Sequence, residues 1–478
     1  MGNKKDVWIC LDLGRTYMDA AILHDGKPLV VGSKTCGRIP ACAYVTSIET
    51  DRFECITGAK AVPFRHSNPE RFLPSIKDGL GKPLPFEDNV SYDFSDVLSA
   101  MFKEVISVAA QSLRGSVPNA ALLTVPTSYT DSDKRKETMI KAATKAGLSK
   151  VEFITEPEAI AQHYAVISNQ SPDLAMVLDL GSRALNITLL DCSKPVGSRL
   201  LMSESKLGLG GEYINKAIYE HIRKQNEATG HPLRVGCMLD DYETCSKMKE
   251  TLSTESTASA YLSGDVHVSL TATTFNTLLE PTVDKALNVC SSLIQNASIM
   301  WADVKCVLLA GGSAQLPAVG NAFKQRLDSP DKMVTVGCGE YDPIFAACLG
   351  GIATKMPPLP EPVAILTDGT TMMQLRAGDN SFGRSSDCDF TIASDKYMSR
   401  LQFKIKVSKN SEGKWDYTVY TLSHGTATII NGLNALILDN PFANQSARIV
   451  IGDEIAAGHS HFKLVSPAII EGMKTNYL

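Results

Sequence analysis

At 478 residues the chain is too long for one ordinary hydrophobic core, so we expect two to four domains. A hydrophobic share of 44% and a charged share of 21% are typical of a soluble globular protein. The formal net charge of −5 disfavours general nucleic-acid binding, and no apolar run reaches membrane-spanning length. The 12 cysteines include no Cys-x-x-Cys pair, and the first residues lack the apolar core of a signal peptide. We therefore expect reduced thiols and a cytoplasmic location, with no nucleic-acid or membrane partner.

Two stretches of the chain follow one pattern. Trp8–Leu23 and Met176–Leu190 each read as an apolar strand, then Asp-Leu-Gly, a short polar turn and a second apolar strand. A glycine turn lets backbone N–H groups approach a polyphosphate, and the neighbouring aspartate can hold Mg²⁺, usually through water. One copy would carry little information. Two copies, one in each half of a large domain, predict a nucleotide held between duplicated lobes.

Strands and helices alternate around these stretches up to about residue 355. We predict a polar, helical, peripheral subregion over residues 211–264. The other predicted helices are Phe94–Leu113, Asp131–Ala146, one that opens at Glu156-Pro157, Pro281–Ala297 and one that begins at Pro317. The predicted strands are Ala120–Val125, Val151–Thr155 and Lys305–Leu309.

The composition changes at residues 356–369, where closely spaced prolines predict a stiff extended connector. Beyond it the hydrophobic period becomes that of strands, and residues 370–478 are expected to form a small all-β sandwich. The predicted strands are residues 372–375, 390–393, 403–407, 417–422, 426–430, 435–438, 448–452 and 461–465.

The order of motifs over most of residues 6–355 resembles the nucleotide-binding domain of the seventy-kilodalton heat-shock chaperones. Four segments carry the resemblance: Leu122–Leu148, Phe153–Ala161, Gly208–Asn215 and Leu308–Pro317. The resemblance implies an α/β actin-like ATPase fold with duplicated ribonuclease-H-like lobes, and ATP or ADP with Mg²⁺ as cofactors. A sugar kinase of the same fold shares the glycine loops but lacks the segments around Val125-Pro126 and Gly210–Glu212.

The same resemblance implies roles for single residues of this chain. Asp12, Lys77, Glu156 and Asp179 are expected at the catalytic centre, with Asp12 and Asp179 as the metal ligands. The residues expected around the phosphates and ribose are Gly14, Arg15, Thr16, Gly181, Ser182, Gly210, Gly211 and Glu212. Those expected to line the adenosine pocket are Ser246, Lys249, Glu250, Ser253, Gly311, Gly312, Ser313, Gln315 and Asp342.

Several positions depart from the family pattern. Arg15 stands where the first loop normally carries threonine, and the second loop has lost two glycines, the threonine hydroxyl and an aspartate, the last replaced by Asn186. Ser246, Glu250 and Gln315 replace charged residues of the adenosine pocket. Loss of one positioned group can lower a rate by roughly 10²–10³-fold, so any ATPase activity is expected to be slow or absent. Arg15 and Arg183 are expected to hold the nucleotide as static counter-charges.

Residues of about 365–467 resemble a forkhead-associated (FHA) domain, a β sandwich that reads phosphothreonine. The motifs are Gly383–Ser385, Cys388-Asp389, Ser399-Arg400 and Gly452–Ile455, with the turn Asn431-Gly432. The residues that this resemblance places in the phosphopeptide site are Arg384, Ser399, Arg400 and Thr426. An arginine fork and a hydroxyl group suit phosphate oxygens.

Two positions of this second domain also depart from its family. Gln402 stands in place of a mostly architectural histidine, so we expect it to affect loop rigidity rather than phosphate contact. Thr426 stands in place of an asparagine that clamps the ligand backbone, so we expect phosphate binding to survive with weaker peptide affinity and selection.

We interpret the chain as a chaperone-like ATP-binding protein with a phosphothreonine-binding module, acting as a nucleotide-switched adaptor in Ser/Thr phosphorylation signalling. Its expected partner is a phosphothreonine-containing protein of a Ser/Thr-kinase pathway. Nothing in the chain resembles the chaperones' peptide-binding sandwich or helical lid, so client refolding is not expected. Two alternatives stay open: an active ATPase that remodels a phosphorylated partner, and an actin-like polymer-forming protein.

Overall fold

The computed structural model divides the chain into two compact units, Met1–Met356 and Pro357–Leu478. The described residues are 6–32, 38–49, 52–86, 91–168, 173–193, 198–230, 233, 238–263, 265–326, 332–334, 341–356, 363–369, 371–385, 387–423, 425–431, 436–439 and 445–467. None of the helices in these ranges is long and apolar enough to cross a membrane. The described cysteines are free thiols, and all but the half-buried Cys55 are buried.

The first unit begins with a sheet in the order β3-β2-β1-β8-β9. Strands β1 (Trp8–Leu13), β2 (Tyr17–His24) and β3 (Lys27–Val30) are antiparallel, whereas β8 (Ala120–Val125) and β9 (Lys150–Thr155) run parallel to β1. The short strand β4 (Ile39–Pro40) pairs with β2. Every residue of β8 is buried, as expected for a parallel strand that is covered on both faces. Helices α2 (Phe94–Ser112) and α3 (Lys134–Lys145) cover one of these faces.

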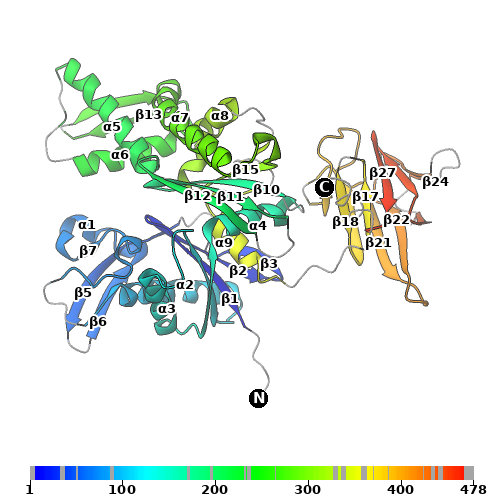
Figure 1. The fold of residues 1–478 in the computed structure, drawn as a ribbon, viewed down its shortest axis with the longest axis horizontal. Helices are drawn as coiled ribbons and strands as arrows, with labels where there is room; N and C mark the ends of the chain where they lie inside the picture. The colour runs from blue at the N-terminus through cyan, green and yellow to red at the C-terminus, as the bar shows by residue number, and fades with distance from the viewer. Residues whose placement is uncertain are drawn as a thin grey trace. The chain divides into compact units, whose positions relative to one another are not determined.

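A second sheet repeats this plan in the order β12-β11-β10-β15-β16. Strands β10 (Leu174–Leu180), β11 (Ala184–Asp191) and β12 (Arg199–Leu207) are antiparallel, and β15 (Cys306–Ala310) and β16 (Met333–Val334) extend the sheet in parallel. Helices α7 (Ala272–Asn296) and α8 (Pro317–Arg326) pack on one face. The predicted duplication of a strand–turn–strand unit is therefore present, and Figure 1 shows the two sheets in the blue and green parts of the ribbon.

Helices α4 (Glu156–Ser168) and α9 (Ala346–Ala353) join the two sheets. Ala346 and Ala347 pack with Ile160 in the core of the second sheet, whereas Cys348 and Ile352 pack on the first. The two helices approach closely because glycine stands at position 350, where an added Cβ atom would overlap the carbonyl oxygen of Ala159. This contact fixes how the lobes meet, and Figure 1 shows both helices between them.

The first unit contains further strands, helices and short turns, some of which border the glycine turns. The strands are β5 (Ala43–Glu49), β6 (Arg52–Thr57), β7 (Phe72–Leu73), β13 (Thr257–Leu262) and β14 (Val266–Thr271). The helices are α1 (Phe64–Ser67), α5 (Gly211–Ala228), α6 (Met238–Thr251) and the 3₁₀ turns η1 (Gly58–Lys60), η2 (Pro69–Arg71), η3 (Lys77–Gly79), η4 (Trp301–Asp303) and η5 (Gly312–Gln315).

Two details of the first unit differ from the sequence prediction. The range 211–264 is not all helical, because β13 pairs with β14 in a hairpin whose buried residues Ala258 and Leu262 lie on one face. Helix α7 begins nine residues before Pro281, at Ala272, where the hydroxyl of Thr271 accepts a hydrogen bond from the N–H of Thr274. Because Phe275 and Leu279 are buried, the helix continues through Pro281. The sequence pattern instead places this proline in the first turn of the helix.

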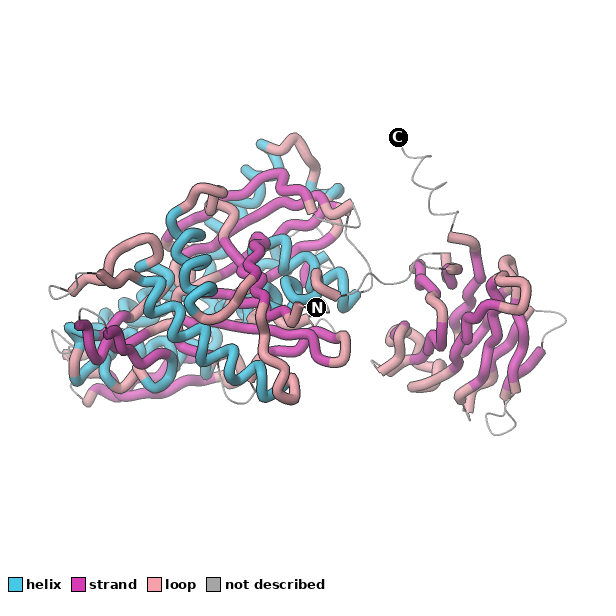
Figure 2. The backbone as a smooth tube through the Cα atoms, turned by 90° about the horizontal axis from the view of Figure 1, so that it is seen from below, coloured by secondary structure: helices cyan, strands magenta, loops and turns pink. Residues whose placement is uncertain are grey.

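The described part of the second unit consists of strands and turns, as Figure 2 shows. One sheet has the order β18-β17-β27-β26-β23-β24 and the other β20-β19-β21-β22-β25. The strands are β17 (Ala364–Thr367), β18 (Met372–Leu375), β19 (Gly378–Gly383), β20 (Phe390–Thr391), β21 (Phe403–Lys409), β22 (Trp415–Thr421), β23 (Thr428–Ile430), β24 (Leu436–Leu438), β25 (Ser446–Ile449), β26 (Glu454–Ala457) and β27 (Ser460–Val465).

The first strand of this sandwich corrects the predicted connector. The sequence pattern assigns residues 356–369 to a linker, but Ala364, Ile365 and Leu366 are buried in a strand that pairs with β18 along its length and with β27 from Ile365 onward. The apolar run that follows the prolines therefore belongs to the sandwich core. The proline-rich part of the connector, residues 357–362, lies outside the described residues.

We predict that Gly350→Ala destabilises the first unit by about 1–3 kcal/mol or more, because the new methyl group overlaps the α4 backbone. Alanine in a helix interior normally stabilises it by roughly 0.5–1 kcal/mol relative to glycine, so the expected sign is opposite to the general trend. Denaturant unfolding followed by fluorescence measures the change. A stability equal to or above that of the unmodified protein would contradict the close helix crossing.

Candidate functional site

The first glycine turn is held by its own hairpin and by the neighbouring strand. Asp12 lies opposite Asp19 across β1 and β2, and its carboxylate accepts a hydrogen bond from the hydroxyl of Thr124 on β8. A Cβ atom on Gly14 would lie 2.7 Å from the carbonyl oxygen of Tyr17, so the turn requires glycine. Thr124 was missed from the sequence, although a hydroxyl in an otherwise apolar strand was a visible signal.

The second glycine turn places Asp179 at the equivalent point of β10. Asn186 lies directly opposite on β11, and its amide donates a 3.4 Å hydrogen bond to the Asp179 carboxylate. Gly311 has a φ of +91° and approaches so closely that a Cβ atom there would lie 2.7 Å from Asp179 Oδ1. The loop after β15 therefore closes on the Asp179 carboxylate.

The four residues predicted for the catalytic centre come together from both lobes. Lys77 Nζ lies 2.9 Å from Glu156 Oε1, and only 8% of Glu156 is exposed. Burial opposes the charge on Lys77, but the carboxylates of Glu156 and Asp12 outweigh it and raise the pKa of the ammonium group. Burial, followed by the charges of Glu156 and Asp12, raises the pKa of Asp179 to about 7. Burial also raises the pKa of Glu156, against the opposing effect of Lys77.

This centre suits a divalent cation held through water. Three carboxylates, Asp12, Glu156 and Asp179, lie near one ammonium group, and additional positive charge would offset their repulsion. Their oxygens do not converge as a compact ligand set; among the described residues only His66, Asp240 and Glu243 do, and those are surface residues. Mg²⁺ usually keeps several waters, so a wider carboxylate frame fits this ion.

The turn at Gly181–Arg183 packs against the start of α5. Gly211 N–H donates to the Gly181 carbonyl at 2.9 Å, and Glu212 N–H donates to the Ser182 carbonyl at 2.7 Å. A Cβ atom on Gly210 would lie 2.5 Å from the backbone of Arg183. The structure thus brings together five of the residues expected at the phosphates: Gly181, Ser182, Gly210, Gly211 and Glu212. Two of the N–H groups at this helix N-terminus are, however, already bonded to the protein.

Both arginines of the glycine turns are paired with carboxylates. Arg15 Nε lies 2.8 Å from Asp78 Oδ2, and Arg15 Nη1 also contacts Glu212. Arg183 lies 3.6 Å from Asp78 and 3.9 Å from Glu212. The sequence prediction treated the arginines as counter-charges for the nucleotide alone and missed Asp78, although this residue directly follows Lys77.

Two residues expected near the adenosine meet beside Gly211. A Cβ atom on Gly211 would lie 2.7 Å from Ser313 Oγ and 3.2 Å from Lys249 Nζ. Lys249 is 8% exposed and donates a 3.4 Å hydrogen bond to the Gly211 carbonyl. Burial lowers the pKa of this ammonium group to about 8, against the charge of Glu250.

The other residues expected at the adenosine are more dispersed. Glu250 and Gln315 are exposed, Ser246 is half-buried, and the Ser253 hydroxyl donates to the Glu250 carbonyl. Asp342 accepts the N–H of Ile344 within its own turn, at 3.0 Å.

Arg38, which the sequence analysis missed, reaches the adenosine loop. A Cβ atom on Gly312 would lie 3.3 Å from its guanidinium group. Arg38 pairs with the buried Asp19 and lies over the Tyr17 ring. A lone arginine beside a stretch of small residues offered little sequence signal.

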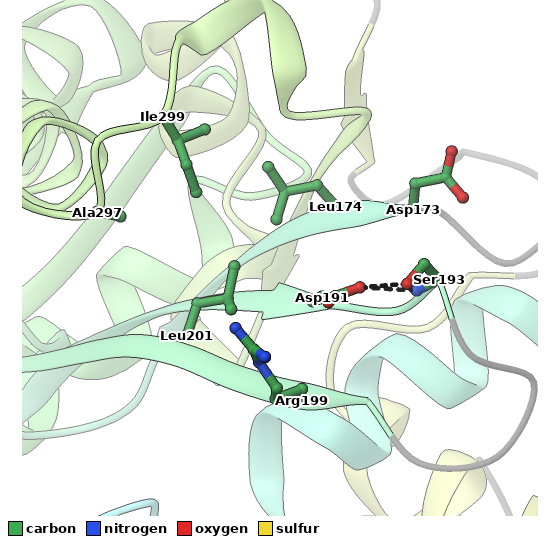
Figure 3. Close-up of a pocket in the computed structure, with 8 residues that line it drawn as sticks. All are labelled: Asp173, Leu174, Asp191, Ser193, Arg199, Leu201, Ala297 and Ile299. Atoms are coloured by element: carbon green, nitrogen blue, oxygen red, sulfur yellow. Dashed lines mark hydrogen bonds between the residues drawn. The ribbon is translucent and has the colours of Figure 1, made fainter. Parts of the chain in front are cut away.

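A cavity of the described residues lies away from these predicted sites. It measures about 550 Å³ and lies at the end of the second sheet where β10 begins, whereas Asp179 lies near the other end of that strand. Figure 3 shows Leu174, Leu201 and Ile299 in its wall, with Arg199 and Asp191 beside them. None of the residues predicted for either site lines this cavity.

In the second unit, the phosphopeptide candidates lie on adjoining loops. Arg384 N–H donates to the Ser399 carbonyl at 3.0 Å, and Ser385 N–H donates to the Arg400 carbonyl at 2.9 Å. A Cβ atom on Gly383 would overlap the Arg400 carbonyl oxygen, so glycine is needed at this position. The exposed side chains of Arg384 and Arg400 form no ion pair with any described residue.

Gln402 connects the loops of this site. Its side chain is fully buried, accepts the Ser399 N–H at 2.9 Å and donates to the Thr426 carbonyl at 2.8 Å. A further 3.2 Å hydrogen bond joins it to Thr428 Oγ1. The amide therefore orders the loops from within, which is the architectural role expected for this position.

Ser423, which the sequence analysis missed, orients the Ser399 hydroxyl. Ser423 Oγ accepts the N–H groups of Gly425 and Thr426, at 3.2 and 3.0 Å, and lies 2.7 Å from Ser399 Oγ. Either hydroxyl can donate in this contact. Because Ser423 Oγ already accepts two N–H groups, donation from Ser423 leaves the Ser399 proton available for a ligand. The Thr426 hydroxyl donates to the Tyr397 carbonyl at 3.0 Å and ties two loops together.

Comparison with known proteins agrees with this architecture. A family model described as Hsp70 protein matches residues 84–412, and one described as FHA domain matches residues 380–458. The overlap of 380–412 falls on sandwich strands of the second unit.

Two curated relatives match 72% and 73% of this chain. The chain is 25% identical over 355 residues to chaperone protein DnaK of Thermoplasma volcanium, covering 72% of this chain and 57% of the relative. It is 26% identical over 375 residues to chaperone protein DnaK of Methanothermobacter thermautotrophicus, covering 73% and 60%. The chain thus spans somewhat more than half the length of these relatives. The Hsp70 match implies an actin-like ATPase fold, and because it extends over more than half of the chain, this protein belongs to the Hsp70 family and carries an FHA domain at its C-terminal side.

Proposed function

We propose that this protein is an ATP-binding adaptor whose FHA domain binds a phosphothreonine-containing protein of a Ser/Thr-kinase pathway in the cytoplasm. The observation that carries the nucleotide part is the convergence of Asp12, Lys77, Glu156 and Asp179 from both lobes. These buried charges have no evident role in stability, because burying like charges together is unfavourable. Phosphoryl chemistry needs such a frame.

Asp12 and Asp179 would hold Mg²⁺ through water, with Glu156 nearby. The ion, when bound, supplies positive charge that offsets the phosphate oxygens. Lys77 adds a second cation, oriented by its 2.9 Å ion pair with Glu156. Glu156 would orient a water molecule, while the amide of Asn186 donates a hydrogen bond to Asp179.

Slow or absent hydrolysis follows from what surrounds this centre. The N–H groups of Gly211 and Glu212 donate to carbonyls of the Gly181–Arg183 turn and are not free for phosphate oxygens. Asn186 supplies an amide in place of a carboxylate beside Asp179. Each missing donor or acceptor can lower a rate by roughly 10²–10³-fold. The bound nucleotide would then change slowly from ATP to ADP. Such a slow change suits a switch better than repeated cycles of ATP hydrolysis.

The FHA part of the proposal rests on unpaired cations beside an oriented hydroxyl group. Arg384 and Arg400 lack carboxylate partners among the described residues, and Ser399 has a proton available for a ligand when Ser423 donates to it. A dianionic phosphate would accept from all three. The Thr426 hydroxyl donates to the Tyr397 carbonyl, so we expect it to bind the backbone of the peptide ligand only weakly.

We predict that the protein binds Mg²⁺-ATP and releases phosphate slowly or not at all. Asp12→Ala should weaken ATP binding at least about tenfold, because a carboxylate of the metal frame is lost. Calorimetry measures binding, and a steady-state assay measures phosphate release. Asp131→Ala is the matched control, since Asp131 is a fully exposed aspartate of the same lobe. Rapid turnover that Asp12→Ala abolishes would instead favour an active ATPase that remodels its partner.

We predict that Asp179 makes the ligand-free protein lose stability as the pH rises. Its pKa is raised from 3.8 in the unfolded chain to about 7 in the folded protein. Its contribution to the free energy of unfolding is therefore complete below about pH 4 and is lost as the pH rises through 7. Melting temperatures recorded from pH 5 to 8 should therefore fall more steeply in the unmodified protein than in Asp179→Asn. Burial raises the pKa of Asp19 to about 6. Asp19 is present in both proteins and contributes equally to the pH dependence of their melting temperatures. Parallel curves for the two proteins would rule out a raised pKa at Asp179.

We predict that Arg384→Ala lowers the affinity for a phosphothreonine peptide by about 10- to 100-fold, since hydrogen bonds to charged groups contribute roughly 1.5–3 kcal/mol. Fluorescence anisotropy with the full chain measures the affinity, with the unphosphorylated peptide as the reference. Arg448→Ala is the matched control, because Arg448 is an exposed arginine of the same unit that pairs with Asp416. Equal affinity for phosphorylated and unphosphorylated peptide would refute the phosphate site. Repeating the titration with ATP and with ADP tests whether the nucleotide switches the adaptor.

A further inference from the structure

Four charged side chains meet where the two glycine turns face each other. Each lobe contributes one arginine and one carboxylate: Arg15 and Asp78 come from the first, Arg183 and Glu212 from the second. Each arginine lies within 4 Å of both carboxylates, so the four groups form a closed network rather than two separate pairs. The network joins the lobes directly beside the proposed phosphate site.

The backbone around Arg183 is already rigid without a ligand. The Gly181–Arg183 turn is bound to the segment before α5 and to its first residues, because Gly208 N–H donates to the Arg183 carbonyl at 3.1 Å and Gly211 N–H donates to Gly181. The close approach of Gly210 leaves no room for the turn to shift inward. The side chain of Arg183 can therefore exchange partners while its backbone stays in place.

The side chains of the network remain accessible to a ligand. Arg15 is 27% exposed, Asp78 and Glu212 are 42% exposed, and Arg183 is 51% exposed. Ion pairs at this exposure are individually weak, on the order of 0–1 kcal/mol. A polyphosphate carries more charge than a carboxylate and accepts bidentate hydrogen bonds from arginine, so it can displace these partners.

We propose that Asp78 and Glu212 determine the phosphate affinity of the proposed nucleotide site. They hold Arg15 and Arg183 in an interlobe network, and a bound polyphosphate has to take the arginines from these carboxylates. Glu212 acts through the arginines rather than by contacting the nucleotide. The proposal rests on the proposed nucleotide binding and predicts that affinity is limited by competition between carboxylate and phosphate.

The test compares Asp78→Asn, Glu212→Gln and the double variant with the unmodified full chain. Calorimetry with Mg²⁺-ATP, Mg²⁺-ADP and adenosine measures affinity, and melting temperatures establish that each variant is folded. We expect each single variant to bind ATP about three- to tenfold more tightly and the double variant more tightly still, because the freed arginines no longer have a carboxylate competitor. Adenosine affinity should stay unchanged, since adenosine lacks phosphate groups.

Glu243→Gln is the matched control. Glu243 of α6 pairs with Arg65 of α1 and also bridges the lobes, but its partner is outside the glycine turns. If losing any interlobe ion pair changed the ATP affinity, this variant would change it equally. If carboxylates compete with phosphate for the arginines, this variant leaves the ATP affinity unchanged. If Glu243→Gln increased the ATP affinity as much as Asp78→Asn or Glu212→Gln does, the proposal would be overturned.

The outcomes separate this proposal from the proposed function. If the unmodified protein binds ATP and the Asp78 and Glu212 variants bind it no more tightly, the competition is refuted while nucleotide binding stands. If only the double variant binds ATP, the competition is supported, and the natural protein is a phosphopeptide-binding scaffold without a nucleotide switch. If neither binds ATP, both proposals fail.

Discussion

The ion pair between Lys77 and Glu156 is the interaction on which the site of the first unit depends. Bringing the buried Glu156 together with the half-buried Asp12 and Asp179 would be strongly unfavourable without a cation among them. Lys77 supplies that cation, and the direction of its pKa shift shows that neighbouring carboxylates outweigh the cost of burial. The carboxylates also keep their frame through hydrogen bonds from Thr124 and Asn186.

Glycine positions govern how closely the parts of this site approach one another. Gly350 lets α9 cross α4, which sets the contact between the lobes, and Gly311 lets the loop after β15 reach Asp179. At Gly210 and Gly211, however, close approach brings the protein's own carbonyls onto N–H groups that could otherwise face phosphate. The close approach that brings these loops together thus also occupies N–H groups of the loops.

In the second unit, the loops around the exposed arginines are held together by uncharged side chains. Its cations stay free because Gln402 and Ser423, rather than the arginines, hold the loops together. Arg384 and Arg400 are accordingly exposed and unpaired among the described residues, whereas Arg15 and Arg183 of the first unit are paired with carboxylates. The two proposed anion sites therefore differ in the free energy needed to release their arginines.

The sequence by itself determined the duplicated hairpins and the change from an α/β region to an all-β region, and it named the candidate residues of both proposed sites. Such features are local: Asp-Leu-Gly turns, strand periods and the motif around Gly383-Arg384 are encoded by neighbouring residues. Tertiary structure alone decided the rest. The start of α7 depended on burial of Phe275, and β17 became a strand because it pairs with β18 and β27, which are separate in sequence. Likewise, the partners of Arg15 are 63 and 197 residues away, a separation at which no sequence period carries information.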